Sequence, residues 1–115
     1  MRYLMLIIND ETAKAVATPE TRELHMAEYT AFNQEMGERG VLQGTVRLHP
    51  TTQAKTVRVR DGEVVAADGP FASTNEQIAG YFVIDCADLD EALEIAAKNP
   101  GARYGTIEVR PIWDM

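Results

Sequence analysis

The sequence predicts an α+β fold in which two helices lie on one face of an antiparallel β-sheet. Two segments, residues 18–38 and 88–98, have the start signals and the apolar spacing of helices. Segments typical of strands stand before, between and after them, and two of these strands are joined by an Asp-Gly turn. In a chain of 115 residues, helices separated by strands in this order favour a two-layer α+β sandwich.

The length and the composition indicate a single domain that spans residues 1–115. A compact chain of this size exposes roughly 6,200 Å² of the roughly 18,400 Å² of its extended form, which is enough burial for one core and too little for two. The single Cys cannot form an internal disulfide, which argues against an oxidised secreted scaffold. The apolar run near the N-terminus is too short for a membrane span and lacks a signal-peptide cleavage region. We therefore expect a cytoplasmic protein that does not bind membranes.

The charge balance argues against nucleic-acid binding. The chain has 18 Asp and Glu residues against 11 Lys and Arg residues. Its only basic cluster, Lys55, Arg58 and Arg60, lies along a predicted strand and is typical of a solvated strand face. The sequence contains no Gly-rich phosphate loop, Cys pair or His-x-x-x-His spacing, so we expect neither a cofactor nor a metal site.

The first strand and the first helix have clear local signals. Residues 3–8 form a continuous apolar run of strand length, consistent with a strand that is covered on both faces. Thr18 is a suitable N-cap and Pro19 fits the first turn of a helix that runs to about Glu38. One stripe of this helix is spaced at i, i+4, i+7 and i+11 and consists of His25, Tyr29, Phe32 and Met36. Glu28 and Glu35 fall beside this stripe and make the amphipathic pattern imperfect.

The middle of the chain predicts a strand at residues 41–48 and then a β-hairpin. Residues 55–60 alternate strictly between polar and apolar side chains, and Asp61-Gly62 suits a two-residue turn with positive φ at both positions. Charge and packing agree on one register, in which the paired residues are Arg60 with Glu63, Val59 with Val64, and Val57 with Ala66.

The last part of the chain predicts a strand, a helix and a final strand. The strand is expected at residues 80–85, and Asp88 and Glu91 form a start like a capping box for the helix. The expected core face of this helix consists of Leu89, Ala92, Leu93 and Ala96. Residues 99–101 (Asn-Pro-Gly) should stop the helix, and the final strand is expected at residues 104–110.

Two predicted strands are apolar on both faces, although the helices can cover only one face of the sheet. These strands are residues 3–8 and residues 81–84. Their second apolar face needs a cover, and a second copy of the chain would supply it. We therefore expect a homodimer.

The motifs, taken in order, resemble the YCII-related family and specifically its DGPF-domain branch. The resemblance covers nearly the whole chain and rests on Asp68-Gly69-Pro70-Phe71, Gly80-Tyr81-Phe82, residues 88–92 and residues 107–111. It implies a ferredoxin-like fold that dimerises into an α+β barrel. It also implies acid–base chemistry, because YCII-type relatives carry a His–Asp pair proposed as catalytic, and some act on small aromatic compounds as dehydrochlorinases.

The resemblance assigns the His of this pair to His25, within the stretch Arg22-Glu23-Leu24-His25. Asp10 stands at the place of the family's Asp, shortly after the first strand, and Asp68 is an alternative partner. A histidine can donate or accept a proton, and a carboxylate on its other nitrogen fixes its tautomer. The alternatives are structural: His25 as a buried or half-buried residue bonded to a backbone carbonyl or to Asp10, Asp10 as a turn residue, and Asp68 in a rigid turn.

Four further residues are candidates for substrate binding, in a pocket expected between the first helix and the sheet. They are Tyr29, Phe71, Ser73 and Tyr81. Such a pocket would be mainly apolar and would suit a small apolar or aromatic ligand. Two of the candidates also have a structural interpretation: Phe71 as a plug in the core, and Tyr81 as an ordinary strand aromatic.

Two functions remain open from the sequence. The first is a homodimeric protein with a small-molecule pocket and metal-free lyase or isomerase chemistry, in which His25 acts as acid or base. The alternative is a non-catalytic ligand-sensing or interaction module. The resemblance implies a link to transcription for this alternative, because the DGPF group is often encoded alongside sigma factors.

Overall fold

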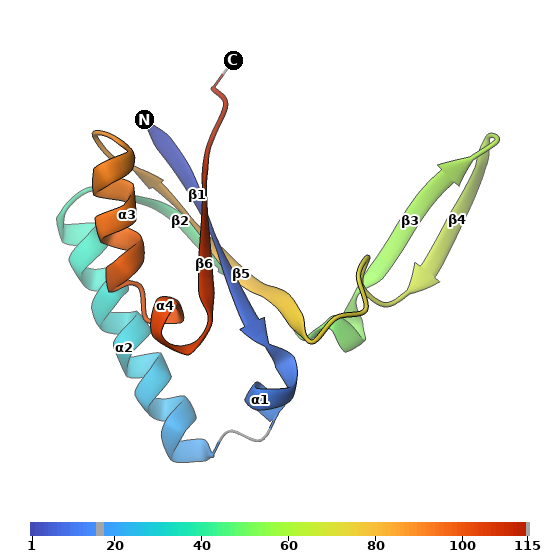
Figure 1. Cartoon of the computed structure of the whole chain (residues 1–115), viewed down its shortest axis with the longest axis horizontal. Coiled ribbons are helices and arrows are strands. Elements are labelled where there is room, and N and C mark those ends of the chain that lie inside the picture. The colour runs from blue at the N-terminus through green and yellow to red at the C-terminus, as the bar shows by residue number, and fades with distance from the viewer. Residues whose placement is uncertain (16–17, 115) are drawn as a thin grey trace.

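The structure is a computed structural model that describes residues 1–15 and 18–114. Its helices and strands follow the order expected from the sequence, with additional short helices (Figure 1). In chain order they are β1 (Arg2–Asp10), α1 (Glu11–Ala15), α2 (Pro19–Glu38), β2 (Leu42–Arg47), the 3₁₀ turn η1 (Thr51–Gln53), β3 (Lys55–Arg60), β4 (Glu63–Asp68), β5 (Glu76–Asp85), α3 (Leu89–Lys98), α4 (Gly101–Tyr104) and β6 (Thr106–Pro111).

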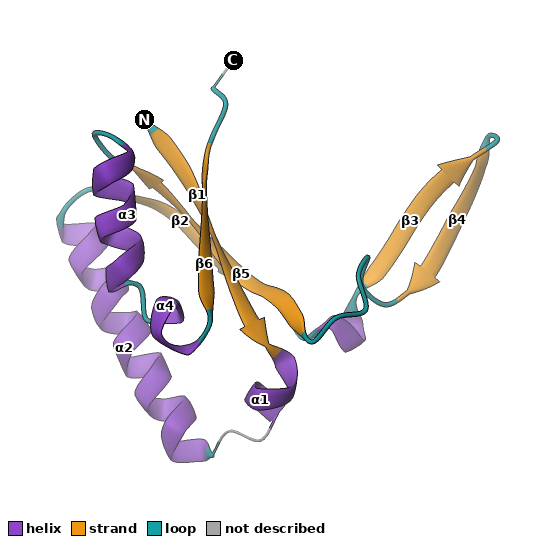
Figure 2. Cartoon of the chain, in the orientation of Figure 1, coloured by secondary structure: helices purple, strands orange, loops and turns teal. Residues whose placement is uncertain are grey.

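The main sheet confirms the predicted fold class. Its four strands are antiparallel and lie in the order β2-β5-β1-β6. With the β3–β4 hairpin set aside, this is the strand order of a ferredoxin-like βαββαβ unit. Figure 2 shows that α2 and α3 lie together on one side of this sheet. In the described part of the chain, no helix is long and apolar enough to cross a membrane.

Helix α2 begins as its sequence predicts. The Thr18 hydroxyl accepts a hydrogen bond from the Thr21 backbone N–H at 3.2 Å, and Pro19 occupies the first turn. The predicted stripe faces the sheet, with Phe32 and Met36 buried and His25 and Tyr29 half-buried. The depth of burial thus decreases toward the N-terminal half of the helix.

Helix α3 starts at the predicted cap, but its predicted core face was partly wrong. The Asp88 carboxylate accepts from the Glu91 N–H at 2.9 Å. The buried residues are Ala92, Ile95 and Ala96, whereas Leu89 and Leu93 are about half exposed. The reason lies after the helix, where Asn99 and Pro100 are fully buried and extend the stripe through residues 92, 95 and 96.

The prediction that the final strand starts at Tyr104 was also wrong, because Gly101–Tyr104 form helix α4 and β6 begins at Thr106. The buried Asn99 side chain accepts a hydrogen bond from the Gly101 N–H at 2.9 Å. The Asn99 carbonyl accepts from the Ala102 N–H at the same distance. Together these bonds turn the chain once more before it enters the sheet.

The β3–β4 hairpin confirms the predicted register, with Arg60 opposite Glu63, Val59 opposite Val64 and Val57 opposite Ala66. Asp61 and Gly62 have φ values of 51° and 78°, as this type of turn requires. The hairpin forms a separate two-stranded sheet and stands apart from the body, on the side of the main sheet away from the helices (Figure 1).

The two faces of the main sheet differ in burial. On β1, Tyr3, Met5 and Ile7 are buried under the helices. The alternate residues of β1 and β5 point to the other side and remain partly accessible; they are Leu4, Leu6, Ile8, Tyr81 and Val83. We call these five residues the open sheet face. The apolar second face that the sequence predicts is therefore present and is not covered within one chain.

Candidate functional site

The candidate site lies where the N-terminal half of α2 meets α4. The His25 imidazole packs against the Tyr104 ring, with ring centroids 3.9 Å apart and planes inclined by 35°. His25 is half-buried and Tyr104 is 48% exposed, so the pair lies at the edge of the core and solvent can reach it. We call this region the α2–α4 junction.

Glu28 lies one turn after His25 and holds two residues of α4. Its carboxylate accepts a hydrogen bond from the Tyr104 hydroxyl at 2.7 Å and forms an ion pair with Arg103. The Glu28 side chain is only 20% exposed. The guanidinium carbon of Arg103 also lies 5.8 Å from the centroid of the Tyr104 ring. Glu28 therefore fixes the position of the ring against which His25 packs.

Tyr29 adds a second hydroxyl at the junction. Burial is the main cause that raises the pKa of Tyr29; nearby Tyr104 also raises it, and Arg47 opposes the shift. Its hydroxyl lies so close to Gly101 that a Cβ on that glycine would be 2.8 Å from the oxygen. The lack of a side chain at Gly101 thus lets α4 approach α2.

A buried acceptor lies at the adjoining end of β1. The Asn9 Oδ1 atom is buried and has no hydrogen-bond partner in the described part of the chain. A Cβ on Gly105, the residue after Tyr104, would be 2.6 Å from this oxygen. The junction therefore combines an imidazole, two phenol hydroxyls, a carboxylate and an amide oxygen from three elements of the fold.

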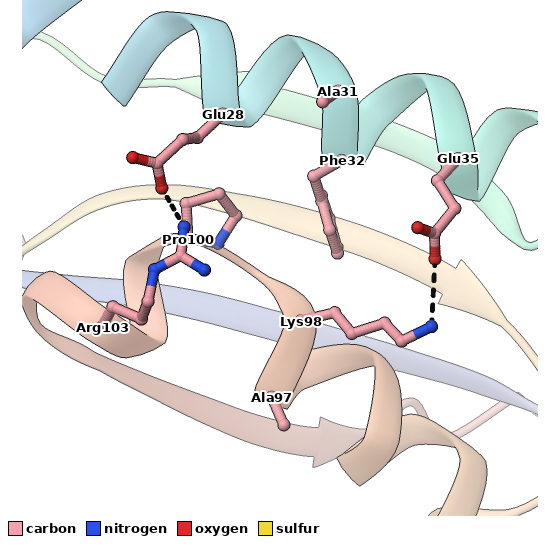
Figure 3. A pocket seen from close by; sticks show the side chains of 8 residues that line it. All are labelled: Glu28, Ala31, Phe32, Glu35, Ala97, Lys98, Pro100 and Arg103. Carbon is pink, nitrogen blue, oxygen red and sulfur yellow. Dashed lines mark hydrogen bonds and ion pairs between the residues drawn. The ribbon is translucent and has the colours of Figure 1, made fainter. Parts of the chain in front are cut away.

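A groove between α2 and α3 extends from the junction (Figure 3). It has a volume of about 500 Å³ and is lined by Glu28, Ala31, Phe32, Glu35, Ala97, Lys98, Pro100 and Arg103. Two ion pairs cross it, Glu28 with Arg103 and Glu35 with Lys98, the latter at 3.2 Å. The groove differs from the pocket expected between the first helix and the sheet. Glu28 and Glu35, which interrupt the amphipathic pattern of α2, were the sequence signal for it.

The two predicted aspartates have other partners. Asp10 Oδ1 accepts from the Thr12 hydroxyl at 2.5 Å and from the Thr12 N–H at 2.9 Å. These bonds, the hydroxyl bond first, lower the pKa of Asp10. Asp68 pairs with Lys55 at 2.5 Å, at the base of the hairpin. Within residues 1–15 and 18–114, no hydrogen bond or ion pair joins either carboxylate to His25.

Of the four predicted ligand-binding residues, only Tyr29 lies beside His25. Tyr81 is on the open sheet face, opposite Leu6. Ser73 is exposed in the loop between β4 and β5. Phe71 is 85% exposed, so the interpretation of it as a core plug was wrong. The turn at the base of the hairpin carries its ring away from the core, to 6.0 Å from the guanidinium carbon of Arg58.

The sequence does not assign Tyr104 to the site, because an aromatic residue in a predicted strand is more often part of the core than of a pocket. Glu28 and Arg103 were missed because their pairing joins segments 75 residues apart. In the described ranges, no group of three or more His, Cys, Asp or Glu side chains is arranged to hold a metal ion.

Comparison with known proteins gives two matches along the chain. The model of the YCII-related domain matches residues 1–115. An uncharacterized protein of Rhizobium meliloti (strain 1021) is 42% identical over 114 residues, which cover 97% of this chain and 92% of that protein.

Proposed function

Since the chain belongs to the YCII-related family, we propose that the α2–α4 junction binds a small aromatic or apolar molecule with one polar group, and that His25 transfers a proton to or from it. The reaction is of the lyase or isomerase kind. The protein acts as a homodimer in which a second copy covers the open sheet face. Its assignment to the DGPF-domain branch stays a prediction based on Asp68-Gly69-Pro70-Phe71.

The observation that carries this proposal is the placement of His25 against Tyr104, whose hydroxyl donates to Glu28. A half-buried imidazole can exchange protons with a bound molecule and with solvent. The wall against which it packs is aromatic and anchored by a carboxylate, which suits a flat apolar ligand. The half-buried Tyr29 supplies a hydroxyl for the polar end of that ligand.

In this proposal His25 removes a proton from a substrate carbon. For a lyase, the electron pair left on that carbon forms a double bond and expels a leaving group from the neighbouring atom. For an isomerase, the electron pair shifts along the substrate and the imidazolium returns the proton to another atom. Glu28 is a positioning residue that acts through Tyr104, and Asp10 serves as the cap of the turn into α1.

The test uses phenol, benzoate and benzamide as probes in ligand-observed NMR, with the amide spectrum of the protein followed in parallel. We expect shifts at residues 25–29 and 101–105, and His25→Ala should weaken binding by about tenfold. The matched control is His49→Ala, which changes the exposed loop histidine and should leave binding unchanged. Equal binding by the His25→Ala variant, or no binding of any probe at millimolar concentration, would contradict the proposal.

The second candidate, a ligand-sensing or interaction module without turnover, is favoured by a different observation. The hairpin and the C-terminal segment expose large apolar side chains, among them Val64 at 72% and Trp113 at 86%. Such side chains are typical of interaction surfaces. Phenol, benzoate and benzamide have no acidic C–H, so turnover is tested with phenylacetone, whose CH₂ next to the carbonyl can lose a proton. Probe binding that depends on His25, without protein-catalysed hydrogen–deuterium exchange at this CH₂, would favour this module over an enzyme.

A further inference from the structure

The two faces of the β3–β4 hairpin differ in chemistry. One face carries Val57, Val59, Val64 and Ala66, because paired and alternate residues of a hairpin share a face. We call these four residues the valine face. The three valines are 65%, 59% and 72% exposed. The opposite face carries Arg58, Arg60, Glu63 and Val65. The hairpin is thus amphipathic, and its apolar side meets solvent within one chain.

A free two-stranded hairpin is at best marginally stable in water and requires packing against another surface. β3 and β4 are hydrogen-bonded to each other and form a sheet of their own. Figure 1 shows them extending away from both the helices and the main sheet. Within a single chain, the apolar valine face is therefore not packed against any other surface.

The size of the exposed surface indicates how much packing is missing. The chain exposes 7925 Å², about 1,700 Å² more than the roughly 6,200 Å² expected of a compact monomer. Its radius of gyration is 16.2 Å, against about 13 Å for a compact chain of this length. If each of two copies buries such an excess, the interface falls within the range of roughly 2,000–5,000 Å² of obligate homodimers.

The open sheet face has the chemistry to receive the valine face. Both are apolar, and the charges at their margins are paired within the chain: Lys55 with Asp68 at the base of the hairpin, and Glu108 with Arg110 on β6. Contact between the two surfaces therefore buries apolar area without leaving a charge unpaired. The hairpin stands on the open side of the main sheet but is directed away from the body of its own chain (Figure 1).

We propose that the β3–β4 hairpin is an arm that packs its valine face on the open sheet face of a second copy of this chain. This inference rests on the homodimer proposed above and specifies how that dimer is held together. Under twofold symmetry each chain gives one arm and receives one, so the contact closes on itself.

The test compares two aspartate substitutions on opposite faces of the same hairpin. Val59→Asp places a charge at the centre of the valine face, whereas Val65→Asp places the same charge on the other face. Both positions are exposed within one chain, at 59% and 49%, so neither substitution should unfold the body. By sedimentation velocity we expect Val59→Asp to raise the dimer dissociation constant about a hundredfold and Val65→Asp to change it by less than about threefold.

If Val59→Asp leaves the dimer intact, the proposed arm is overturned. If Leu6→Asp dissociates that same dimer, the homodimer of the proposed function still stands. Equal weakening by both hairpin variants would overturn the assignment to the valine face. A wild-type chain that is monomeric at every concentration would overturn both the arm and the homodimer. Circular dichroism of each variant checks that the body remains folded.

The docking surface is tested in mixed dimers, which pair a ¹⁵N-labelled chain with an unlabelled chain that carries a nitroxide at Asp61→Cys. Because the observed chain carries no nitroxide, any broadening of its amide signals comes from its partner. We expect broadening on β1 and β5, centred on Leu6 and Tyr81. Broadening confined to α2 and α3, or no broadening in a confirmed dimer, would overturn the proposal.

Discussion

The His25 imidazole and the Tyr104 ring lie 3.9 Å apart, centroid to centroid, although the two residues are 79 positions apart in the sequence. The contact depends on α4, a single helical turn that interrupts the path from α3 into β6. Without this turn, Tyr104 would lie in a strand, as its sequence suggested. The junction is therefore a tertiary feature, built on the buried Asn99 that starts the turn.

The first prediction concerns the energy of this contact. Aromatic pairs contribute about 0.5–1.5 kcal/mol beyond the area that they bury. A double-mutant cycle with His25→Ala, Tyr104→Ala and the double variant should give a coupling free energy in that range, measured by urea unfolding. Glu28→Ala combined with His25→Ala should give a smaller coupling free energy, because Glu28 is bonded to Tyr104 and affects His25 only through that ring. Strict additivity of the two aromatic substitutions would show that the rings do not interact.

The second prediction concerns the close approach of α4 to α2. In Gly101→Ala the new Cβ would lie 2.8 Å from the Tyr29 hydroxyl and 3.0 Å from Ile107 Cδ1. We expect a loss of about 1–3 kcal/mol in the free energy of unfolding. Tyr29→Phe in the same chain should restore part of it, because it removes the nearest atom.

The control for that substitution is Gly37→Ala in α2, where a new Cβ meets no atom within 4 Å. Alanine is a better helix former than glycine, so this variant should be more stable by up to about 1 kcal/mol. If both glycine variants change stability in the same direction, the steric argument for Gly101 fails.

The sequence predicted most of the fold because its signals were local. Asp61-Gly62 set the hairpin register, and Thr18 and Asp88 marked the starts of two helices. The sequence could not predict that Asn99 starts helix α4, because this role depends on the complete burial of its side chain in the folded chain. The position of the hairpin relative to the sheet was not predictable either, since alternation fixes which residues share a face but not what that face meets.

Of the candidate site, the sequence predicted only residues that lie on helix α2. His25 and Tyr29 share a stripe of α2 through helical periodicity. Their partners Tyr104 and Arg103 come from a turn that has no periodic signal of its own. The family resemblance assigned Asp10 as the partner of His25 from its position in the sequence alone. Position in the sequence does not indicate that the Asp10 carboxylate is hydrogen-bonded to Thr12.

The third prediction compares two asparagines that differ in what they bond. Asn99 is fully buried, and its Oδ1 accepts from the Gly101 N–H at 2.9 Å, whereas its Nδ2 has no partner among the described residues. Asn99→Ala leaves the buried Gly101 N–H without an acceptor, which outweighs the removal of Nδ2, so the variant should be less stable by about 1–3 kcal/mol. Asn33 lies inside α2, and its Oδ1 is buried without a partner among the described residues. Asn33→Ala should therefore stabilise the protein by about 0.5 kcal/mol, through better helix propensity and removal of that acceptor. Thermal and urea unfolding of both variants check the opposite signs, and a destabilised Asn33→Ala would mean that the amide has an unrecognised partner.

The last prediction concerns how the free energy of unfolding depends on pH in the acidic range. The Thr12 hydroxyl and N–H stabilise the ionised form of Asp10, so its pKa in the folded chain is below the ordinary value. A carboxyl group whose pKa is lower in the folded than in the unfolded chain stabilises the fold. This contribution is complete above the unfolded pKa, at about pH 4 and higher, and it disappears as the pH falls through the folded pKa. Asp10→Asn should therefore show a shallower loss of stability below about pH 4 than the wild type.

The shift itself is measured by carboxyl-detected NMR titration, and Thr12→Val serves as the matched variant. It removes the hydroxyl, the largest cause of the shift, and keeps the backbone N–H bond, so the pKa of Asp10 should rise only part of the way toward the ordinary value. If the pKa of Asp10 in the wild type is at or above the ordinary value, the carboxylate is not held by Thr12. It would then be free to orient His25, as the family resemblance implies.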